Sequence, residues 1–163
     1  NRKLKNPYCD VFFFYYTNIA GPRFLVALSV VMLIFGKRWI GDAAYEMVLA
    51  LVLSTLVAQL LKRVISRSRP YWVMKNLNTY GIDLTDYSFP SGHTTAAFTV
   101  ATTFSLYFPK IAALCFIMAI LVAISRTYLA VHYPTDVLAG IIIGIGVAYV
   151  VHIYVYGAVA NWI

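Results

Sequence analysis

The chain has 163 residues, of which 61% are hydrophobic and 12% are charged, and its formal net charge is +7. A soluble domain is nearer half apolar and a quarter charged, so this composition excludes an ordinary soluble domain and points to a lipid bilayer as the solvent. We therefore expect the positive charge to lie at membrane edges beside anionic lipid, and we expect no nucleic-acid partner.

The N-terminal stretch, residues 1–20, contains a short apolar run, VFFFYY at 11–16, flanked by Asn, Asp and Thr residues. A run of this length does not cross a hydrocarbon core about 30 Å thick. We predict a helix that lies along the membrane interface. The alternative is the end of a longer first span that this chain lacks.

Five apolar segments follow, and each is able to cover most of the hydrocarbon core as a helix. Their residues do not alternate with a period of two, so strands are not expected. We predict one all-α, integral-membrane helical bundle, a single domain over residues 1–163 with its transmembrane part at 22–156. The five predicted spans run from about Pro22 to Ile40, Ala43 to Leu61, Ser91 to Phe108, Ile111 to Ile124, and Val137 to Tyr156.

The last predicted span carries a GxxxG pattern at Gly140 and Gly144. Small residues at this spacing let two membrane helices approach closely. The pattern therefore predicts close helix packing rather than a catalytic use.

The longest polar stretch is the loop at residues 62–90. Because each span reverses the direction of the chain, this loop lies on the same membrane side as the N-terminal tail and the junction at 125–136. Lys62 and Arg69 are seven residues apart, so on a helix they would point the same way, and Pro70 would then end that helix.

The polar residues that gather on this side suit the binding and cleavage of a phosphate monoester. Cations neutralise the dianion, and the free N–H groups of a helix N-terminus after Pro90 bind anions. One neutral histidine can attack phosphorus, a second can protonate the leaving oxygen, and a carboxylate can fix the tautomer of the first. The candidates are the cations Lys62, Arg69 and Arg126, the histidines His93 and His132, the carboxylate Asp136, and Ser91 with Gly92 at the helix start.

Three motifs built from these residues resemble the signature motifs of the type 2 phosphatidic acid phosphatase family, which includes soluble vanadium haloperoxidases. The motifs are Lys62-x6-Arg69-Pro70, Pro90-Ser91-Gly92-His93, and Ser125-Arg126-x5-His132-x3-Asp136.

The resemblance implies a helical core and a covalent phosphohistidine formed without a metal or cofactor. It implies that His132 is the nucleophile, that Asp136 is its partner and that His93 is the general acid. The phosphate would be held by Lys62, Arg69, Arg126, Ser91 and the Gly92 amide. Many members of the family have six spans, one more than we predict here.

The expected activity is metal-independent hydrolysis of a lipid phosphate, with phosphatidylglycerol phosphate, phosphatidic acid and a polyprenyl diphosphate as candidate substrates. A phosphotransferase that uses the same site is the alternative. A transporter with a His/Asp proton relay is a third possibility, but it is disfavoured because the polar residues collect at one membrane face.

Other charged residues are expected to have ordinary roles. Arg63, Arg67 and Lys75 are interpreted as topology anchors or headgroup contacts. Asp83 and Asp86 are interpreted as solvated loop residues in preference to a metal site. Glu46 is expected to be a helix-start acid or an interhelical partner, and His152 is expected to be structural.

The charges alone give an ambiguous orientation. Ten Lys and Arg residues lie on the side of the 62–90 loop and three lie on the other, which by the positive-inside rule would make the loop side cytoplasmic. Three of the ten are candidate catalytic residues, however, and the family resemblance favours an outward-facing site. We predict a multi-pass protein of the cell membrane with its active site at the outer face, and we leave its oligomeric state open.

Overall fold

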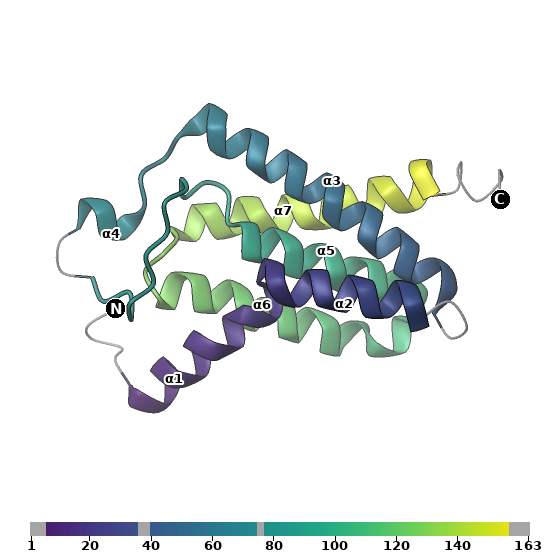
Figure 1. Ribbon diagram of the computed structural model, residues 1–163, viewed down its shortest axis with the longest axis horizontal. Helices are drawn as coiled ribbons and strands as arrows, with labels where there is room; N and C mark the ends of the chain where they lie inside the picture. The colour runs from purple at the N-terminus through teal and green to yellow at the C-terminus, as the bar shows by residue number, and fades with distance from the viewer. Residues whose placement is uncertain (1–5, 36–39, 75–76, 157–163) are drawn as a thin grey trace.

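The structure is a computed structural model that describes residues 6–35, 40–74 and 77–156, and no strand occurs in these ranges. Figure 1 shows an elongated bundle with α5 running through its middle and the 62–90 loop at one end. The helices are α1 (Pro7–Tyr16), η2 (Thr17–Ala20), α2 (Pro22–Phe35), α3 (Gly41–Ile65), α4 (Pro70–Val73), α5 (Gly92–Tyr107), η4 (Pro109–Ile111), α6 (Ala112–Tyr128), α7 (Pro134–Val150) and η5 (Val151–Tyr156).

A helix forms at each of the five predicted spans, which confirms the all-α bundle. By length and composition, three described helical segments can cross a membrane, namely Gly41–Val73, Pro109–Tyr128 and Pro134–Tyr154. The pair Pro7–Ala20 and Pro22–Phe35 is bent by 47° and adds a fourth if it forms one broken span. The remaining helix, α5, has only 16 residues, but α3, α6 and α7 pack around it. The predicted interfacial position of α1 stays a prediction. Cations at 2, 3, 5, 37, 38 and 75 lie outside the described residues.

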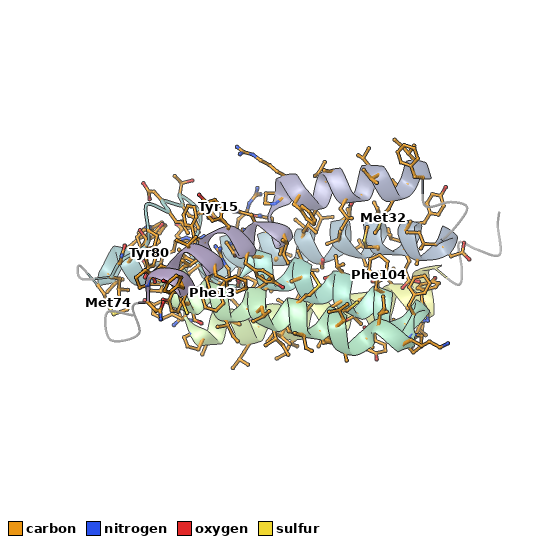
Figure 2. The ribbon with its side chains drawn as sticks, turned by 90° about the horizontal axis from the view of Figure 1, so that it is seen from below. Phe13, Tyr15, Met32, Met74, Tyr80 and Phe104 are labelled. Carbon is orange, nitrogen blue, oxygen red and sulfur yellow. The ribbon has the colours of Figure 1, made fainter. Side chains whose placement is uncertain are left out.

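The interior of the bundle is built from small and hydroxyl-bearing side chains, whereas large apolar side chains cover its outside (Figure 2). On α5 the buried residues include Thr94, Thr95, Thr99, Thr102 and Thr103. The outward faces of the other helices carry exposed large apolar residues such as Val26, Leu60, Ile117 and Ile142. This distribution suits helices that pack closely together and face lipid on the outside.

The predicted close packing at the GxxxG pattern is confirmed at the contact between α7 and α5. A Cβ atom added to Gly140 would lie 2.9 Å from the carbonyl oxygen of Ser91, and one added to Gly144 would lie 2.5 Å from that of Thr95. Only glycine allows the two backbones to approach this closely. An added Cβ on Gly146, on the same helix, would meet nothing within 4 Å.

The helix α1 packs against α6 at the loop end of the bundle. Asn6 caps its N-terminus by accepting a hydrogen bond from the backbone N–H of Tyr8 at 2.9 Å. The Asp10 carboxylate accepts hydrogen bonds from the hydroxyls of Tyr80 and Tyr128, at 2.8 and 2.5 Å. These two bonds join α1 to both the 62–90 loop and α6.

A second polar cluster lies at the other end of the bundle. The buried Glu46 on α3 accepts a hydrogen bond from the Tyr107 hydroxyl at 2.8 Å and lies 3.0 Å from Nδ1 of His152. The prediction that Glu46 is an interhelical partner is therefore confirmed, and His152 pairs with it.

Candidate active site

Six of the eight predicted site residues line one cavity of about 330 Å³ at the loop end of the bundle. They come from α3, the 62–90 loop, the start of α5, the end of α6, and the turn between α6 and α7. The six residues are Lys62, Arg69, Gly92, His93, Arg126 and His132. Ser91 and Asp136 are fully buried and do not line this cavity.

His132 lies in the turn between α6 and α7, two residues before the proline that opens α7. Its Nδ1 donates a hydrogen bond to the carbonyl oxygen of Ser88 at 2.8 Å, and its Nε2 lies 3.4 Å from Nη1 of Arg69. A carbonyl oxygen can only accept, so the proton sits on Nδ1 and the lone pair is left on Nε2. The sequence could not reveal Ser88 as a partner, because the bond uses its backbone.

Burial lowers the pKa of His132 to about 4, helped by the positive charges of Arg126, Arg69 and Lys62 and opposed by Asp136. The imidazole is therefore neutral at physiological pH. A neutral ring with a free Nε2 is the form that can act as a nucleophile.

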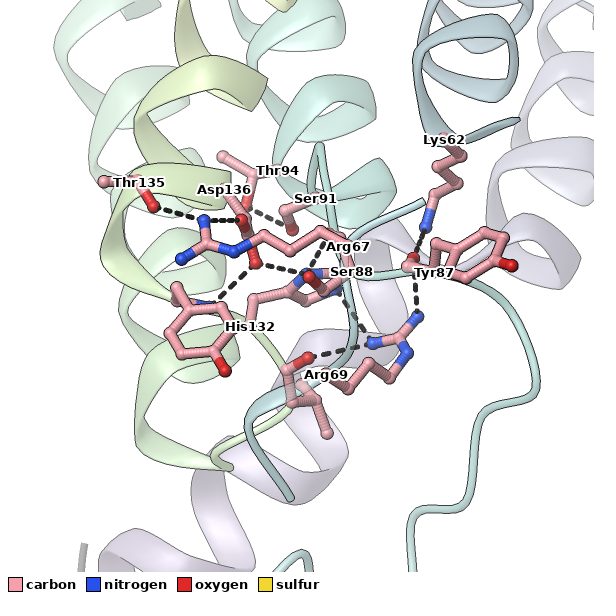
Figure 3. Close-up of polar contacts among 12 residues, drawn as sticks. Lys62, Arg67, Arg69, Tyr87, Ser88, Ser91, Thr94, His132, Thr135 and Asp136 are labelled. Atoms are coloured by element: carbon pink, nitrogen blue, oxygen red, sulfur yellow. Dashed lines mark hydrogen bonds and ion pairs between the residues drawn. The ribbon is translucent and has the colours of Figure 1, made fainter. Parts of the chain in front are cut away.

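The predicted partner Asp136 lies close to His132 but does not make its short hydrogen bond. Its Oδ2 is 3.7 Å from Nδ1 of His132 and accepts the backbone N–H of Tyr133 at 2.9 Å, at the start of α7. Its Oδ1 pairs with Nη1 of Arg67 at 2.8 Å. Asp136 thus adds negative charge beside the ring, and the Ser88 carbonyl holds the tautomer (Figure 3).

Arg67, interpreted from the sequence as a topology anchor or headgroup contact, has protein partners that this interpretation did not include. Its guanidinium pairs with Asp136, donates to Oγ1 of Thr135 at 2.7 Å and lies 3.9 Å from the centre of the Tyr133 ring. Arg67 therefore braces the first turn of α7, and a role at the bilayer surface stays a prediction. In the sequence, the one hint of a role in the site was that Arg67 lies two residues before the predicted site residue Arg69.

Lys62 and Arg69 come together, but not by sharing a helix face as the sequence analysis expected. The helix α3 ends at Ile65, where Ser66 takes a left-handed conformation with φ of 48°, and Arg69 lies in an extended segment. The two cations meet at Asp86 instead. Oδ2 of Asp86 is 2.8 Å from Nζ of Lys62, and its Oδ1 is 2.6 Å from Nη2 of Arg69.

Asp86 is half exposed, as expected of a solvated loop residue, but its carboxylate also binds both cations in the cavity lining, a pairing that the sequence did not predict. An acid in a loop rich in Lys and Arg was a signal that charge pairing could occur. Which cations it would reach depends on how the loop folds back over the end of α3.

Arg126 is buried at the end of α6 with part of its guanidinium unused. Its Nη1 donates to Oγ1 of Thr17 in η2 at 2.8 Å, a contact that no pattern in the sequence predicts. Its buried Nε has no hydrogen-bond partner among the residues that the structure describes. A buried donor without a partner is costly, and other parts of the Arg126 side chain line the adjoining cavity.

The start of α5 contributes Gly92 and His93 to the cavity, whereas the hydroxyl of Ser91 is engaged elsewhere. Oγ of Ser91 lies 2.9 Å from Oγ1 of Thr94, and the backbone N–H of Ser91 donates to the carbonyl oxygen of Asp136 at 3.0 Å. The second bond ties the beginning of α5 to the beginning of α7. The predicted role of the Ser91 hydroxyl in phosphate binding stays a prediction, because this residue does not line the cavity.

Within the described ranges there is no group of three or more His, Cys, Asp or Glu side chains arranged to hold a metal ion. The cavity lining instead combines three cations, two histidines and Asp86.

A sequence model described as the PAP2 superfamily matches residues 43–160. The chain is 35% identical over 121 residues to a protein of Sulfolobus acidocaldarius named undecaprenyl-diphosphatase, an alignment that covers 73% of this chain and 57% of that protein. The chain spans 44% to 66% of the length of the sequence relatives it matches.

Two solved structures have a similar arrangement. The structure of Aquifex aeolicus LpxE gives a TM-score of 0.83 at 32% identity and covers 93% of this chain and 90% of that one. A Bacillus subtilis transmembrane phosphatidylglycerolphosphate phosphatase of the PAP2 type gives 0.77 at 26% identity, covering 98% and 80%. The integral-membrane helical bundle predicted from the sequence is thus also the architecture of these proteins.

Proposed function

The chain belongs to the PAP2 superfamily, and we propose that it is a membrane phosphatase that removes a phosphate group from a lipid through a phosphohistidine at His132. The observation that carries the proposal is the cavity at the loop end of the bundle. It brings two histidines together with Lys62, Arg69 and Arg126, three cations that come from separate parts of the chain.

The electrostatics of the cavity support a phosphate ligand. Lys62, Arg69 and Arg126 bring three positive charges to one small cavity, against the single negative charge of Asp86. Guanidinium groups bind phosphate oxygens with charge-assisted hydrogen bonds, which are stronger than neutral ones.

An apolar cavity of about 240 Å³ adjoins the charged one and supports a lipid as the phosphate carrier. It lies between α2, α5 and α6, and the two cavities share Ala20 and Leu25. A ligand with a phosphate head and a hydrocarbon tail would place its head in the charged cavity and its tail in the apolar one. A water-soluble phosphate ester would leave the apolar cavity without a partner.

In the first step of the proposed mechanism, Nε2 of His132 attacks phosphorus and the bond from phosphorus to the lipid oxygen breaks. His93 gives its proton to that oxygen, so the lipid leaves as a neutral alcohol or, from a diphosphate, as a protonated monophosphate. Lys62, Arg69 and Arg126 stabilise the charge that spreads over the remaining phosphate oxygens.

In the second step, His93 takes a proton from water, and the water oxygen attacks the phosphorus of the phosphohistidine. The bond between phosphorus and Nε2 breaks, phosphate leaves, and His132 returns to its neutral form. The Ser88 carbonyl keeps the Nδ1 proton in place throughout, and the charge of Asp136 stabilises the positive ring of the intermediate.

The substrate candidates are phosphatidylglycerol phosphate, phosphatidic acid and a polyprenyl diphosphate. The names of the two relatives, undecaprenyl-diphosphatase and phosphatidylglycerolphosphate phosphatase, favour the first and the third for testing. We further propose that the chain is a multi-pass protein of the cell membrane whose site faces outward.

The test is phosphate release by the purified protein in detergent and EDTA, with each of the three lipids as substrate. We expect release from at least one lipid, and we expect His132→Ala to lower kcat by at least about 10³-fold, as removal of a covalent nucleophile does in other enzymes. The fastest substrate would identify the lipid.

The matched control is His152→Gln, which changes the histidine at the far end of the bundle and keeps a hydrogen-bond donor for Glu46. It should retain the kcat of the wild type within about threefold, as expected of a residue remote from the chemistry. Release that persists in His132→Ala would contradict the mechanism. Transfer of the phosphate to a second lipid, instead of release, would favour the phosphotransferase.

A further inference from the structure

We propose that the carboxylate of Asp86 is an internal competitor of the substrate phosphate. In the unliganded protein it occupies Lys62 and Arg69, and it must leave them before a phosphate group can bind. This inference rests on the proposed function, because it assigns a ligand to the same cavity.

The geometry of the contact is that of an anion held by two donors. The two carboxylate oxygens are bound separately, Oδ2 by Nζ of Lys62 at 2.8 Å and Oδ1 by Nη2 of Arg69 at 2.6 Å. A phosphate group offers two oxygens to the same pair of donors in the same way. Asp86 lines the cavity together with Arg126 and His132, so its carboxylate lies where a substrate phosphate would enter.

The two sides of this contact differ in their freedom to move. The side chains of Lys62 and Arg69 are only 6% and 2% exposed, whereas that of Asp86 is 50% exposed. The cations are therefore fixed by their surroundings, while the carboxylate can turn out of the cavity into water.

Asp86 carries its charge under the conditions in which the protein works. Burial raises the pKa of this carboxyl, but Lys62 and Arg69 outweigh burial and bring the pKa below its ordinary value. A charged Asp86 that stayed in place would repel a phosphate dianion, so the two anions exclude each other.

The cations keep other contacts when the carboxylate leaves. The carbonyl oxygen of Asp86 accepts from Nε of Arg69 at 2.7 Å, and that of Tyr87 accepts from Nζ of Lys62 at 2.6 Å. These backbone contacts orient Lys62 and Arg69 without the help of the carboxylate. The carboxylate is thus separable from the scaffold, as a competitor must be.

A competitor of this kind lowers the apparent affinity for every phosphate ligand by one common factor, the inverse of the fraction of protein with a free site. Two ion pairs that are half exposed on one side are modest in strength. We therefore expect the common factor to be about tenfold.

The experiment compares wild type, Asp86→Asn and Asp83→Asn as full-length purified proteins. Asp83 is exposed in the same loop, so Asp83→Asn removes the same charge three residues away and serves as the matched control. Calorimetry measures the Kd of inorganic phosphate and of orthovanadate, and phosphate-release assays measure the KM of the lipid.

We expect Asp86→Asn to bind phosphate and vanadate about tenfold more tightly and to lower KM by a similar factor, with Asp83→Asn within about twofold of wild type. Asp86→Ser, whose short side chain cannot reach both cations, should do the same and guards against an effect of asparagine itself.

Unchanged or weaker phosphate binding in both Asp86 variants would overturn the inference and make Asp86 a positioning residue for Lys62 and Arg69. If Asp83→Asn bound phosphate equally more tightly, the inference would also be overturned, because the effect would then come from the net charge of the loop. If wild type and all variants fail to bind phosphate or vanadate, the phosphate site itself is wrong and the proposed function fails with it.

Discussion

The protonation state of His132 follows from three contacts of one ring. The Ser88 carbonyl binds the Nδ1 proton, Arg69 approaches Nε2, and the surrounding bundle excludes water. Burial and Arg69 favour the neutral ring, because a second proton would have to be placed beside a guanidinium in a buried site, whereas the Ser88 carbonyl fixes which nitrogen carries the proton. Asp136 moderates the effect without cancelling it.

The first prediction at the residue scale concerns pH. Because the pKa of His132 is lowered to about 4, protonation should inactivate the nucleophile only below that value. After correction for the ionisation of the substrate phosphate, which titrates near pH 6, kcat/KM should not fall between pH 7 and about 5, where protonation of the general acid His93 can only raise it, and should decrease only below about pH 4. The measurement is a pH profile of kcat/KM in detergent.

The lowered pKa of His132 also decides how the stability of the folded protein depends on pH. The unfolded chain, with a His132 pKa near its ordinary value, binds more protons than the folded protein between about pH 6.5 and 4. Protonation therefore favours unfolding, and the contribution of His132 to stability is lost as pH falls through this window. A fall of kcat/KM as the pH drops below about 6.5 would show that burial does not lower the pKa of His132.

At the element scale, the packing of α7 on α5 positions the site. Gly140 brings α7 against the carbonyl of Ser91, and the N–H of Ser91 donates to the carbonyl of Asp136. The first turns of the two helices are thus joined at the point where both enter the active-site end of the bundle. A shift of one helix along the other would displace His93 relative to His132.

The prediction at this scale is that Gly144→Ala destabilises the protein. Its Cβ would lie 2.5 Å from the Thr95 carbonyl, so the helices must separate, and overpacking of this kind costs about 1–3 kcal/mol. Thermal inactivation of the detergent-solubilised protein, followed by phosphate release, measures the loss. A small decrease in kcat is also expected, because Gly144 lies one turn beyond Gly140 on the same face.

The matched control is Gly146→Ala, on the same helix but facing open space. It should show no loss of stability, since alanine is the better helix former. If the two alanine variants lose stability equally, the close approach of α7 and α5 is not what holds them together.

At the scale of the whole molecule, the polar chemistry is concentrated at one end, where α1, the 62–90 loop and the turn between α6 and α7 meet (Figure 1). The apolar exterior of α2, α3, α6 and α7 covers the remainder of the bundle. A lipid would keep its tail in the bilayer while its phosphate reaches the charged end. In the proposed function, the membrane side that this end faces decides which leaflet supplies the lipid.

The proposed outward orientation is tested by thiol labelling in intact cells. In a background of Cys9→Ser and Cys115→Ser, Asp83→Cys should react with a membrane-impermeant maleimide, because Asp83 is exposed on the loop at the active-site end. Lys110→Cys, exposed at the opposite end of α5, is the control and should react only after permeabilisation. The reverse pattern would place the active site in the cytoplasm and contradict the proposal.

Features that depend on local composition and chain order could be predicted from the sequence alone. The lengths of the apolar segments predicted the helical bundle. Because the chain reverses direction at each span, residues as distant as Lys62 and Asp136 were predicted to lie on one side of the membrane. The chemical types of Lys62, Arg126 and His132 were enough to suggest a phosphate. The glycine spacing in the last span predicted where two helices approach. These inferences hold because hydrophobic length and chain direction need no knowledge of side-chain contacts.

The pairing of the charges and the atom that orients His132 follow from the three-dimensional packing of the chain. Arg67 binds Asp136, Asp86 holds Lys62 and Arg69, and the carbonyl of Ser88 orients His132. Five of these residues lie in the 62–90 loop, where several pairings satisfy the same composition. The choice among them depends on where the loop backbone ends after α3 stops at Ile65. Every residue has a backbone carbonyl that can accept a hydrogen bond, so the identity of the residue that accepts from His132 depends on the fold and cannot be read from the side chains in the sequence.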